Sequence, residues 1–234
     1  MFYYDAVYWI LLLPVLILSV YAQIKVSSSF NKYSKARNRR GITGAQAAYG
    51  VLRANGVHDV AIRPCRGRLT DHYDPRDNTI YLSEPVYNSA TVAAVGVASH
   101  EAGHAVQYAM GYGPVRVRSA VIPVTNFGSQ FAFIALFLGI FLYSQPLFLV
   151  GVVLFSMTTL FQLVTLPVEF NASARALQTI DGAHLLDDDE RRGAKKVLTA
   201  AALTYVAALL TSLLQLLRYL LIFASRSNNS RSRR

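Results

Sequence analysis

Four long apolar stretches limit what this chain of 234 residues can fold into more than any other feature does. They occupy residues 7–24, 124–143, 147–170 and 197–223. A helix needs about 20 mostly apolar residues to cross a bilayer, and each stretch has or approaches that length. Charged residues make up only 15% of the chain, whereas soluble domains carry about a quarter. The sequence therefore predicts a mainly α-helical, multi-pass protein of the cell membrane with about four membrane helices.

The chain is strongly basic, with a formal net charge of +10. A basic excess is typical of proteins that bind nucleic acid or an anionic membrane surface. Because the charges flank apolar stretches and no nucleic-acid-binding motif occurs, we expect membrane lipids as partners and no nucleic acid. The single cysteine, Cys65, excludes an internal disulfide and a cysteine-based zinc finger.

The distribution of lysine and arginine predicts the orientation in the membrane. Basic residues gather at 25–40, directly after the first stretch, and Arg116 and Arg118 precede the second. The link between the second and third stretches, residues 144–146, carries no charge. Since cytoplasmic loops carry an excess of lysine and arginine, residues 25–120 are predicted to be cytoplasmic and the N-terminus external.

We expect residues 1–224 to form a single membrane-embedded domain, followed by a basic, disordered tail at 225–234. A fourth full span would place this tail outside, against the charge rule. Either the tail is an exception, or the fourth segment is bent, re-entrant or packed on the membrane surface.

A small α+β part is predicted between the first two stretches. Its elements are a helix at 44–55, short strands at 60–62 and 79–82, and a helix at 90–110. Thr43 and Gln46 have the spacing of a capping box, and Gly56 is a typical helix stop. Asn88 or Ser89 can cap the second helix. Together these elements predict a short β-hairpin or sheet beside that helix.

The second of these helices carries the sequence His100-Glu101-Ala102-Gly103-His104. A separation of four residues places both imidazoles on one helix face, where they can bind one Zn²⁺. Glu101 is rotated by about one residue step from His100, so it can reach a water activated by zinc and act as general base without competing for the metal. The same pattern could arise by chance on a solvated helix. Against this, two of the five histidines lie here, and the first half of the helix is almost wholly Ala and Val, as in a buried helix.

A catalytic zinc site needs a third protein ligand. The metzincin pattern would place a histidine at position 110, where Met110 stands. Glu169 is the only acidic residue between Glu101 and Asp181, and it ends the third stretch on the same predicted side as His100. We therefore expect Glu169 to bind the metal, with a carboxylate at the membrane interface as the alternative. One zinc ion per chain is predicted.

Several segments resemble the neutral zinc metallopeptidase family of small bacterial membrane proteins (YugP-like) and, more distantly, the HtpX and CAAX-prenyl-protease group. These segments are residues 69–75, 80–83, 97–107 and 168–173. The resemblance implies a gluzincin-like fold in which His100, His104 and Glu169 hold zinc and Glu101 is the base. In the HtpX-like group an aspartate follows the third ligand by four residues, whereas Ser173 stands here.

The chain is thus expected to be a zinc-dependent membrane endopeptidase acting on misfolded or membrane-associated polypeptides at the cytoplasmic face. Residues 80–82 are expected to form an edge strand to which an extended substrate adds as a further strand. Two alternatives stay open, namely a protease that cleaves within the membrane and a non-catalytic scaffold that binds zinc.

Weaker candidates surround this site. His72 could contact substrate or simply pack in a loop. The oxyanion could be stabilised by His184, Tyr205 or Arg175, with no geometric reason to choose. The acidic run that begins at Asp187 is interpreted as the start of a helix rather than as a metal site.

Overall fold

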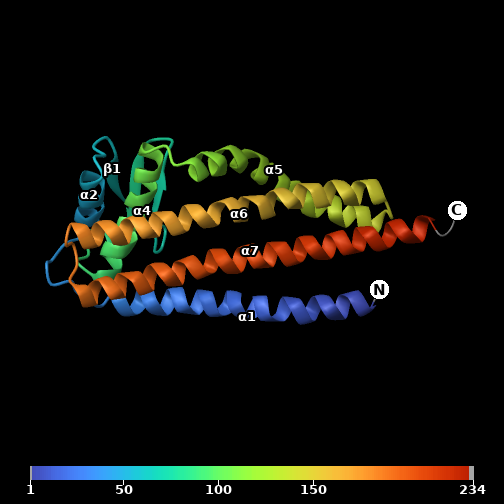
Figure 1. Ribbon diagram of the computed structural model, residues 1–234, viewed down its shortest axis with the longest axis horizontal. Helices are drawn as coiled ribbons and strands as arrows, with labels where there is room; N and C mark the ends of the chain where they lie inside the picture. The colour runs from blue at the N-terminus through green and yellow to red at the C-terminus, as the bar shows by residue number, and fades with distance from the viewer. Residues whose placement is uncertain (1, 232–234) are drawn as a thin grey trace. The chain divides into compact units, whose positions relative to one another are not determined.

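The computed structural model describes residues 2–231, without the side chains of 2–8, 11 and 226–231 (Figure 1). Met1 and residues 232–234, the end of the predicted tail, lie outside the described part. The elements in chain order are α1 (Phe2–Tyr33), α2 (Gly44–Ala54), β1 (Ala61–Cys65), β2 (His72–Asp74), β3 (Thr79–Ser83), α3 (Glu84–Tyr87), α4 (Val92–Ala109), α5 (Gly113–Phe141), α6 (Gln145–Gly182) and α7 (Asp188–Arg231).

Among the described residues, α1, α5, α6 and α7 are long and apolar enough to cross a membrane. The predicted mainly helical membrane protein with about four such helices is therefore confirmed. Three of the predicted stretches lie within longer helices, because the helices continue beyond their apolar parts, whereas the second stretch, predicted to reach residue 143, ends with α5 at Phe141. Helix α6, for example, covers residues 147–170 and then extends through a more polar segment to Gly182. Helix α7 runs without interruption.

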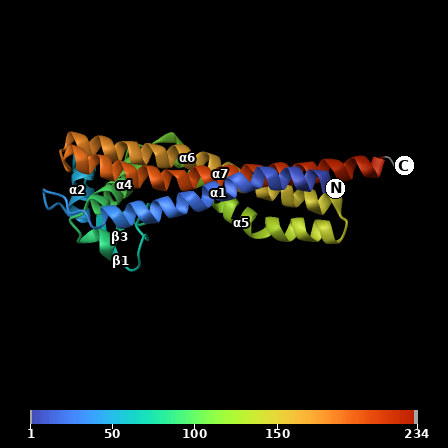
Figure 2. The same ribbon diagram turned by 90° about the horizontal axis from the view of Figure 1, so that it is seen from below.

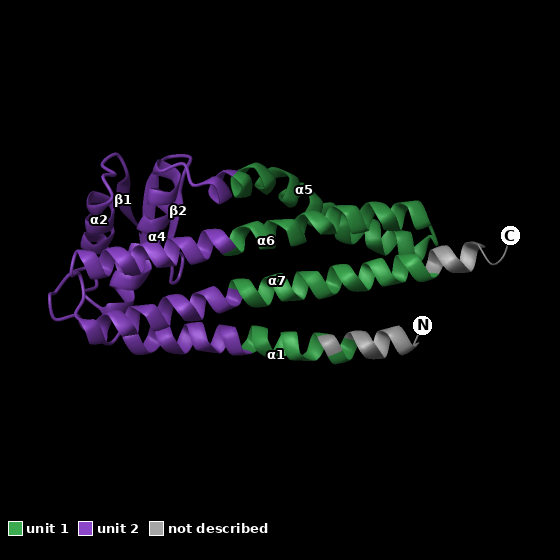
Figure 3. Ribbon diagram, viewed as in Figure 1, with its two compact units in different colours: residues 1–20, 117–166, 205–234 green, residues 21–116, 167–204 purple. Residues whose placement is uncertain are grey.

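The chain divides into two compact units, coloured separately in Figure 3. Unit 1 comprises residues 1–20, 117–166 and 205–234, and unit 2 comprises residues 21–116 and 167–204. Unit 1 consists of helical segments with a small buried cluster of Leu136, Phe148 and Val152. Unit 2 holds the sheet, the short helices and the larger buried core.

The sheet of unit 2 has the strand order β1-β3-β2, with β1 parallel and β2 antiparallel to β3. The two predicted strands are present, but β2 was not predicted, because its sequence His72-Tyr73-Asp74 lacks an apolar alternation. The expectation that residues 80–82 form an edge strand was wrong. Strand β3 pairs with a neighbour on both sides, so the edges of the sheet are β1 and β2.

The short helices follow their local signals. The capping box of α2 is present, since Thr43 Oγ1 accepts from the Gln46 N–H and Gln46 Oε1 accepts from the Thr43 N–H. The cap of α4 is Thr91, whose hydroxyl accepts from the Ala94 N–H. The prediction of Asn88 or Ser89 was wrong because residues 84–87 form α3, which ends at Asn88.

Helix α4 packs against α2, α3 and the sheet, and Figure 2 shows it beside α2 and β3. Its first half is buried on nearly all sides, as expected from its Ala and Val residues. Ala93, Ala94 and Ala98 belong to the same buried cluster as Ile80 and Leu82 of β3. The first half of α4 is therefore fixed inside unit 2, and the H-E-x-x-H sequence follows on this fixed segment.

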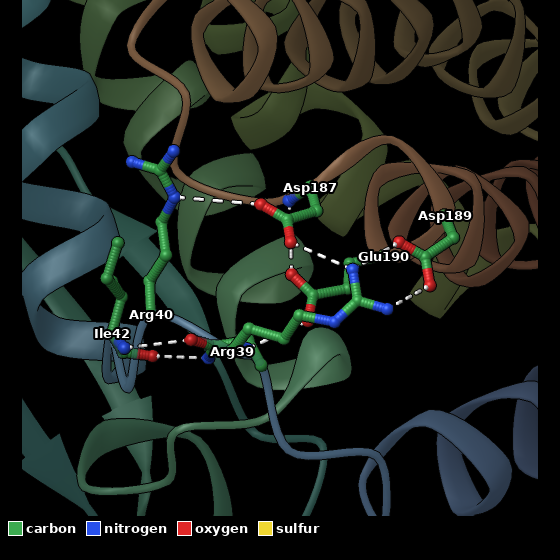
Figure 4. A network of polar contacts seen from close by, with 7 residues as sticks. Arg39, Arg40, Ile42, Asp187, Asp189 and Glu190 are labelled. Carbon is green, nitrogen blue, oxygen red and sulfur yellow. Dashed lines mark hydrogen bonds and ion pairs between the residues drawn. The ribbon is translucent and has the colours of Figure 1, made fainter.

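The start of α7 is held by the polar network in Figure 4. Glu190 accepts hydrogen bonds from the backbone N–H groups of Arg39 and Asp187, and the Arg39 guanidinium pairs with Asp187 and Asp189. The acidic run thus begins a helix, as interpreted from the sequence. Because the Arg39 guanidinium is exposed, water and salt weaken these ion pairs.

Candidate metal centre

His100 and His104 lie one turn apart on α4, with ring centroids 4.7 Å from each other and ring planes nearly perpendicular. Both side chains are largely buried. The Nε2 atoms of both rings face the carboxylate of Glu169 on α6, which is only 3% exposed. The structure therefore brings together the three residues that the sequence indicated as ligands.

The spacing of these atoms fits a small tetrahedral cation. Glu169 Oε2 lies 3.3 Å from His100 Nε2 and 3.5 Å from His104 Nε2, and one ligand atom from each of the three residues lies within 4.8 Å of the others. Bonds of 2.0–2.1 Å at tetrahedral angles separate two ligand atoms by roughly 3.3–3.4 Å. The nitrogen and oxygen donors are those that zinc prefers, so the residues present fit this ion.

Each imidazole is held at its other nitrogen. His100 Nδ1 lies 3.1 Å from Ser173 Oγ, and His104 Nδ1 lies 3.0 Å from Gln107 Oε1. Partners of this kind orient a ligating histidine and fix its tautomer. Ser173 thus occupies the place where the HtpX-like group has an aspartate, and it supplies a hydroxyl instead of a charge.

The approach of α6 to α4 depends on a glycine within the motif. A Cβ atom at Gly103 would lie 2.6 Å from the backbone oxygen of Ala172, closer than a carbon atom can approach without displacing one helix. Ala172 lies three residues after Glu169. Gly103 therefore permits the contact that places Glu169 beside the two histidines.

Glu101 is buried, at 9% exposure, and stands apart from the three clustered residues. Its Oε2 accepts a hydrogen bond of 3.1 Å from the backbone N–H of Tyr73 in β2. The contact fixes the carboxylate beside the edge strand of the sheet. Its separation from the cluster agrees with a role in moving protons rather than in binding metal.

The electrostatics of the cluster favour a positive charge. Burial lowers the pKa of His104, but the hydrogen bond with Glu169 and the charges of Glu101 and Glu169 outweigh it, so the pKa lies above its ordinary value. Without a metal, these carboxylates stabilise the imidazolium form. A divalent cation would take the place of that proton, because the ligating nitrogen must be deprotonated.

The weaker candidates lie elsewhere or contact other groups. His72 stacks on Tyr81 of β3, and its Nδ1 lies 2.8 Å from the Thr70 oxygen. Arg175 donates to Asn171, and His184 lies in the link between α6 and α7 with a positive φ of 48°. Tyr205 belongs to unit 1, whereas the cluster belongs to unit 2.

Three site residues lie in the segments that carry the family resemblance but were given no individual role from the sequence, namely Tyr73, Gln107 and Asn171. Gln107 lies one turn after His104, and Asn171 lies two residues after Glu169. A polar residue at such a spacing on an otherwise apolar helix is the only signal that could have indicated Gln107. The role of Tyr73 is carried by its backbone, so side-chain chemistry gave no indication of it.

Two histidines of an H-E-x-x-H helix that meet a glutamate of a second helix, in a chain with four candidate membrane spans, indicate a zinc metallopeptidase of the membrane. Comparison with known proteins agrees with this class. The chain belongs to the family described as "Putative neutral zinc metallopeptidase", whose model matches residues 8–224. The protein is therefore an enzyme that hydrolyses peptide bonds.

One relative is the Bacillus subtilis (strain 168) protein described as "Putative membrane protease YugP". The two chains are 50% identical over 206 residues, which cover 88% of this chain and 92% of the relative. No solved structure matches the chain.

Proposed function

We propose that the protein is an endopeptidase with one zinc ion per chain, held by His100, His104 and Glu169, and with Glu101 as general base. The observation that carries this proposal is the distance of Glu169 Oε2 from the two Nε2 atoms, 3.3 Å and 3.5 Å, which fits neighbouring ligands of a tetrahedral zinc ion. Three protein ligands leave a fourth position for water, as catalytic zinc sites do. Within residues 2–231 the cluster has no fourth protein ligand, and this favours catalysis over a structural zinc site.

Zinc, when bound, supplies positive charge that acidifies the attacking water and polarises the scissile carbonyl. Glu101 takes the proton from that water and later gives it to the leaving nitrogen. The Tyr73 N–H holds the Glu101 carboxylate at the edge of the sheet while the imidazoles stay fixed by Ser173 and Gln107. The residues of this chain thus keep the base and the ligands in separate, fixed positions.

The substrate is proposed to bind in extended form along β2. Because β3 is paired on both sides, it cannot accept a further strand. Strand β2 is an edge beside Glu101. Because the Tyr73 N–H is already bonded to Glu101, the substrate would pair with the other backbone groups of this edge. Backbone hydrogen bonds to an edge strand depend little on the substrate sequence, which suits misfolded or membrane-associated polypeptides.

We place the catalytic part at the cytoplasmic face. The support is the concentration of lysine and arginine at residues 25–40, which follow the first candidate span. A reporter inserted within residues 57–78 should be cytoplasmic, and one inserted at Gln145 should be external. The reverse pattern would place the site on the other side.

The direct test compares wild type with Glu101→Gln in zinc content and in casein hydrolysis. The variant should retain zinc, because Glu101 is not a ligand in this proposal. Its turnover should fall by about 10²–10⁴-fold, since an amide cannot accept the proton. Wild-type turnover in this variant would exclude Glu101 as the base. Full zinc content in both His100→Ala and His104→Ala would exclude the metal site.

A further inference from the structure

Gln107 is a fully buried polar side chain whose two ends serve different partners. Its Oε1 lies 3.0 Å from His104 Nδ1. Its Nε2 donates to the backbone oxygen of Val168 at 2.8 Å and to Asn171 Oδ1 at 3.0 Å. A buried amide is costly unless its donors and acceptor are paired, and here all of them are.

Arg175, which lies at the other end of this series of hydrogen bonds, determines their direction. Arg175 donates its Nε–H to Asn171 Oδ1 at 2.8 Å, and a guanidinium can only donate. The Asn171 atom at this position must therefore be the oxygen, which requires the Gln107 nitrogen to face it. The Val168 carbonyl, which can only accept, imposes the same orientation on Gln107 independently.

The orientation of Gln107 determines the tautomer of His104. With Oε1 facing the ring, His104 Nδ1 must carry a proton, so the neutral ring has its lone pair on Nε2, the nitrogen that faces Glu169. The other tautomer would direct an N–H at the metal position and leave two acceptors facing each other. The Val168 oxygen and Asn171 Oδ1, which accept from the Gln107 Nε2, lie on either side of Glu169 in the sequence. The same amide therefore connects His104 on α4 with the segment of α6 that carries Glu169.

We propose that Arg175, Asn171 and Gln107 form a directional hydrogen-bond relay that positions His104 for metal binding. None of the three binds the metal, so they are positioning residues. The proposal rests on the proposed function of the same site. It gives Arg175 a role different from the oxyanion stabiliser considered from the sequence. It also means that both metal-binding histidines are held by uncharged partners, Gln107 and Ser173.

The test measures zinc affinity by chelator competition and the visible spectrum of the Co²⁺-loaded protein. Gln107→Met, which has a similar size and no amide, should weaken zinc binding by about 10–100-fold and alter the Co²⁺ bands. Gln178→Met is the matched control, because it makes the same substitution at an exposed glutamine of α6 that has no part in the relay. It should bind zinc within about threefold of wild type, well inside the range that losing such a partner costs.

Gln107→Glu separates positioning from simple packing. It keeps an acceptor toward His104 but loses the donor toward Val168 and Asn171, so its zinc affinity should lie between those of wild type and Gln107→Met. The unfolding midpoint of the metal-free protein checks that each variant is folded. Zinc affinity and Co²⁺ bands of Gln107→Met that match the wild type would overturn the relay.

His104→Ala, measured in the same assay, distinguishes failure of the proposed metal site from failure of the proposed relay. If His104→Ala keeps zinc, the assignment of the metal site is wrong. If His104→Ala loses zinc and Gln107→Met keeps full affinity, only the relay is wrong.

Discussion

The two units of this protein place their apolar side chains in opposite ways. In unit 2 the large apolar residues Ile80, Leu82 and Val106 are completely buried. In unit 1 the phenylalanines of α5 lie on the outside, with Phe133 72% and Phe141 68% exposed. Exposed aromatic rings in such number are unfavourable in water and favourable in lipid. Unit 2 is thus built around its own core, whereas unit 1 depends on the bilayer.

Helix α6 belongs to both units and changes character along its length. Its first part, up to Leu166, lies in unit 1, is mostly apolar and has no charged residue, whereas the part from Pro167 lies in unit 2. The unit 2 part carries Glu169, Asn171, Ser173 and Arg175, all of which have polar partners near the cluster. One helix therefore combines a membrane segment with a set of polar residues that complete the site.

The largest effect is expected from Glu169→Gln. An amide is a poor substitute for an anionic ligand, so zinc affinity should fall by more than the roughly 10–100-fold that losing an outer hydrogen bond costs. Peptidase activity should be abolished. Zinc affinity and casein hydrolysis measure the effect.

Asp181→Asn is the control for this change. Asp181 is also an acidic residue of α6, but it pairs with Arg191 and is mostly exposed. Zinc binding and activity should be unchanged in the control. Equal zinc loss in both variants would mean that charge along α6, rather than ligation by Glu169, supports the site.

A smaller effect is expected from a charge on the outer face of unit 1. Phe133 lies in the middle of the apolar stretch 124–143 and is 72% exposed. A charged residue at the centre of a membrane helix costs about 2.5–3.5 kcal/mol. Phe133→Asp should therefore lower the thermal unfolding midpoint in lipid nanodiscs.

Tyr49→Asp makes the same kind of change in unit 2, where Tyr49 is 53% exposed on α2. Because this side chain faces water in our interpretation, the substitution should alter stability by no more than about 0.5 kcal/mol. A similar loss in both variants would remove the distinction between the two units.

The smallest effect concerns packing inside unit 2. Gly103→Ala places a methyl group against the Ala172 oxygen and should cost about 1–3 kcal/mol of folding free energy, with weaker zinc binding as α6 moves away. Gly182→Ala is the control, because a Cβ atom there meets nothing within 4 Å. Unfolding midpoints and zinc affinities of the two variants measure the difference. An unchanged Gly103→Ala protein would show that α4 and α6 do not need this close contact.

Local patterns in the sequence were sufficient to predict the membrane helices, helix α2 and the helix face shared by His100 and His104. Each of these depends on residues within a few positions of one another: apolar length, a capping box, or a four-residue spacing on a helix. Glu169 could be selected as well, because it is the only carboxylate in a long segment that returns to the same predicted side. That it binds the metal stays a prediction, while its place beside both histidines is observed.

The tertiary structure alone decided the order of the strands and the partners of the site. Strand β2 gains its place from pairing with β3, and Tyr73 meets Glu101 through a backbone N–H that is the same in any sequence. Gln107 acquires its relay only because Gly103 lets α6 approach α4 and brings Asn171 within hydrogen-bond distance. The contacts of Glu101, Gly103 and Gln107 join residues more than 25 positions apart. A linear pattern specifies which side chains are available but not which of them meet.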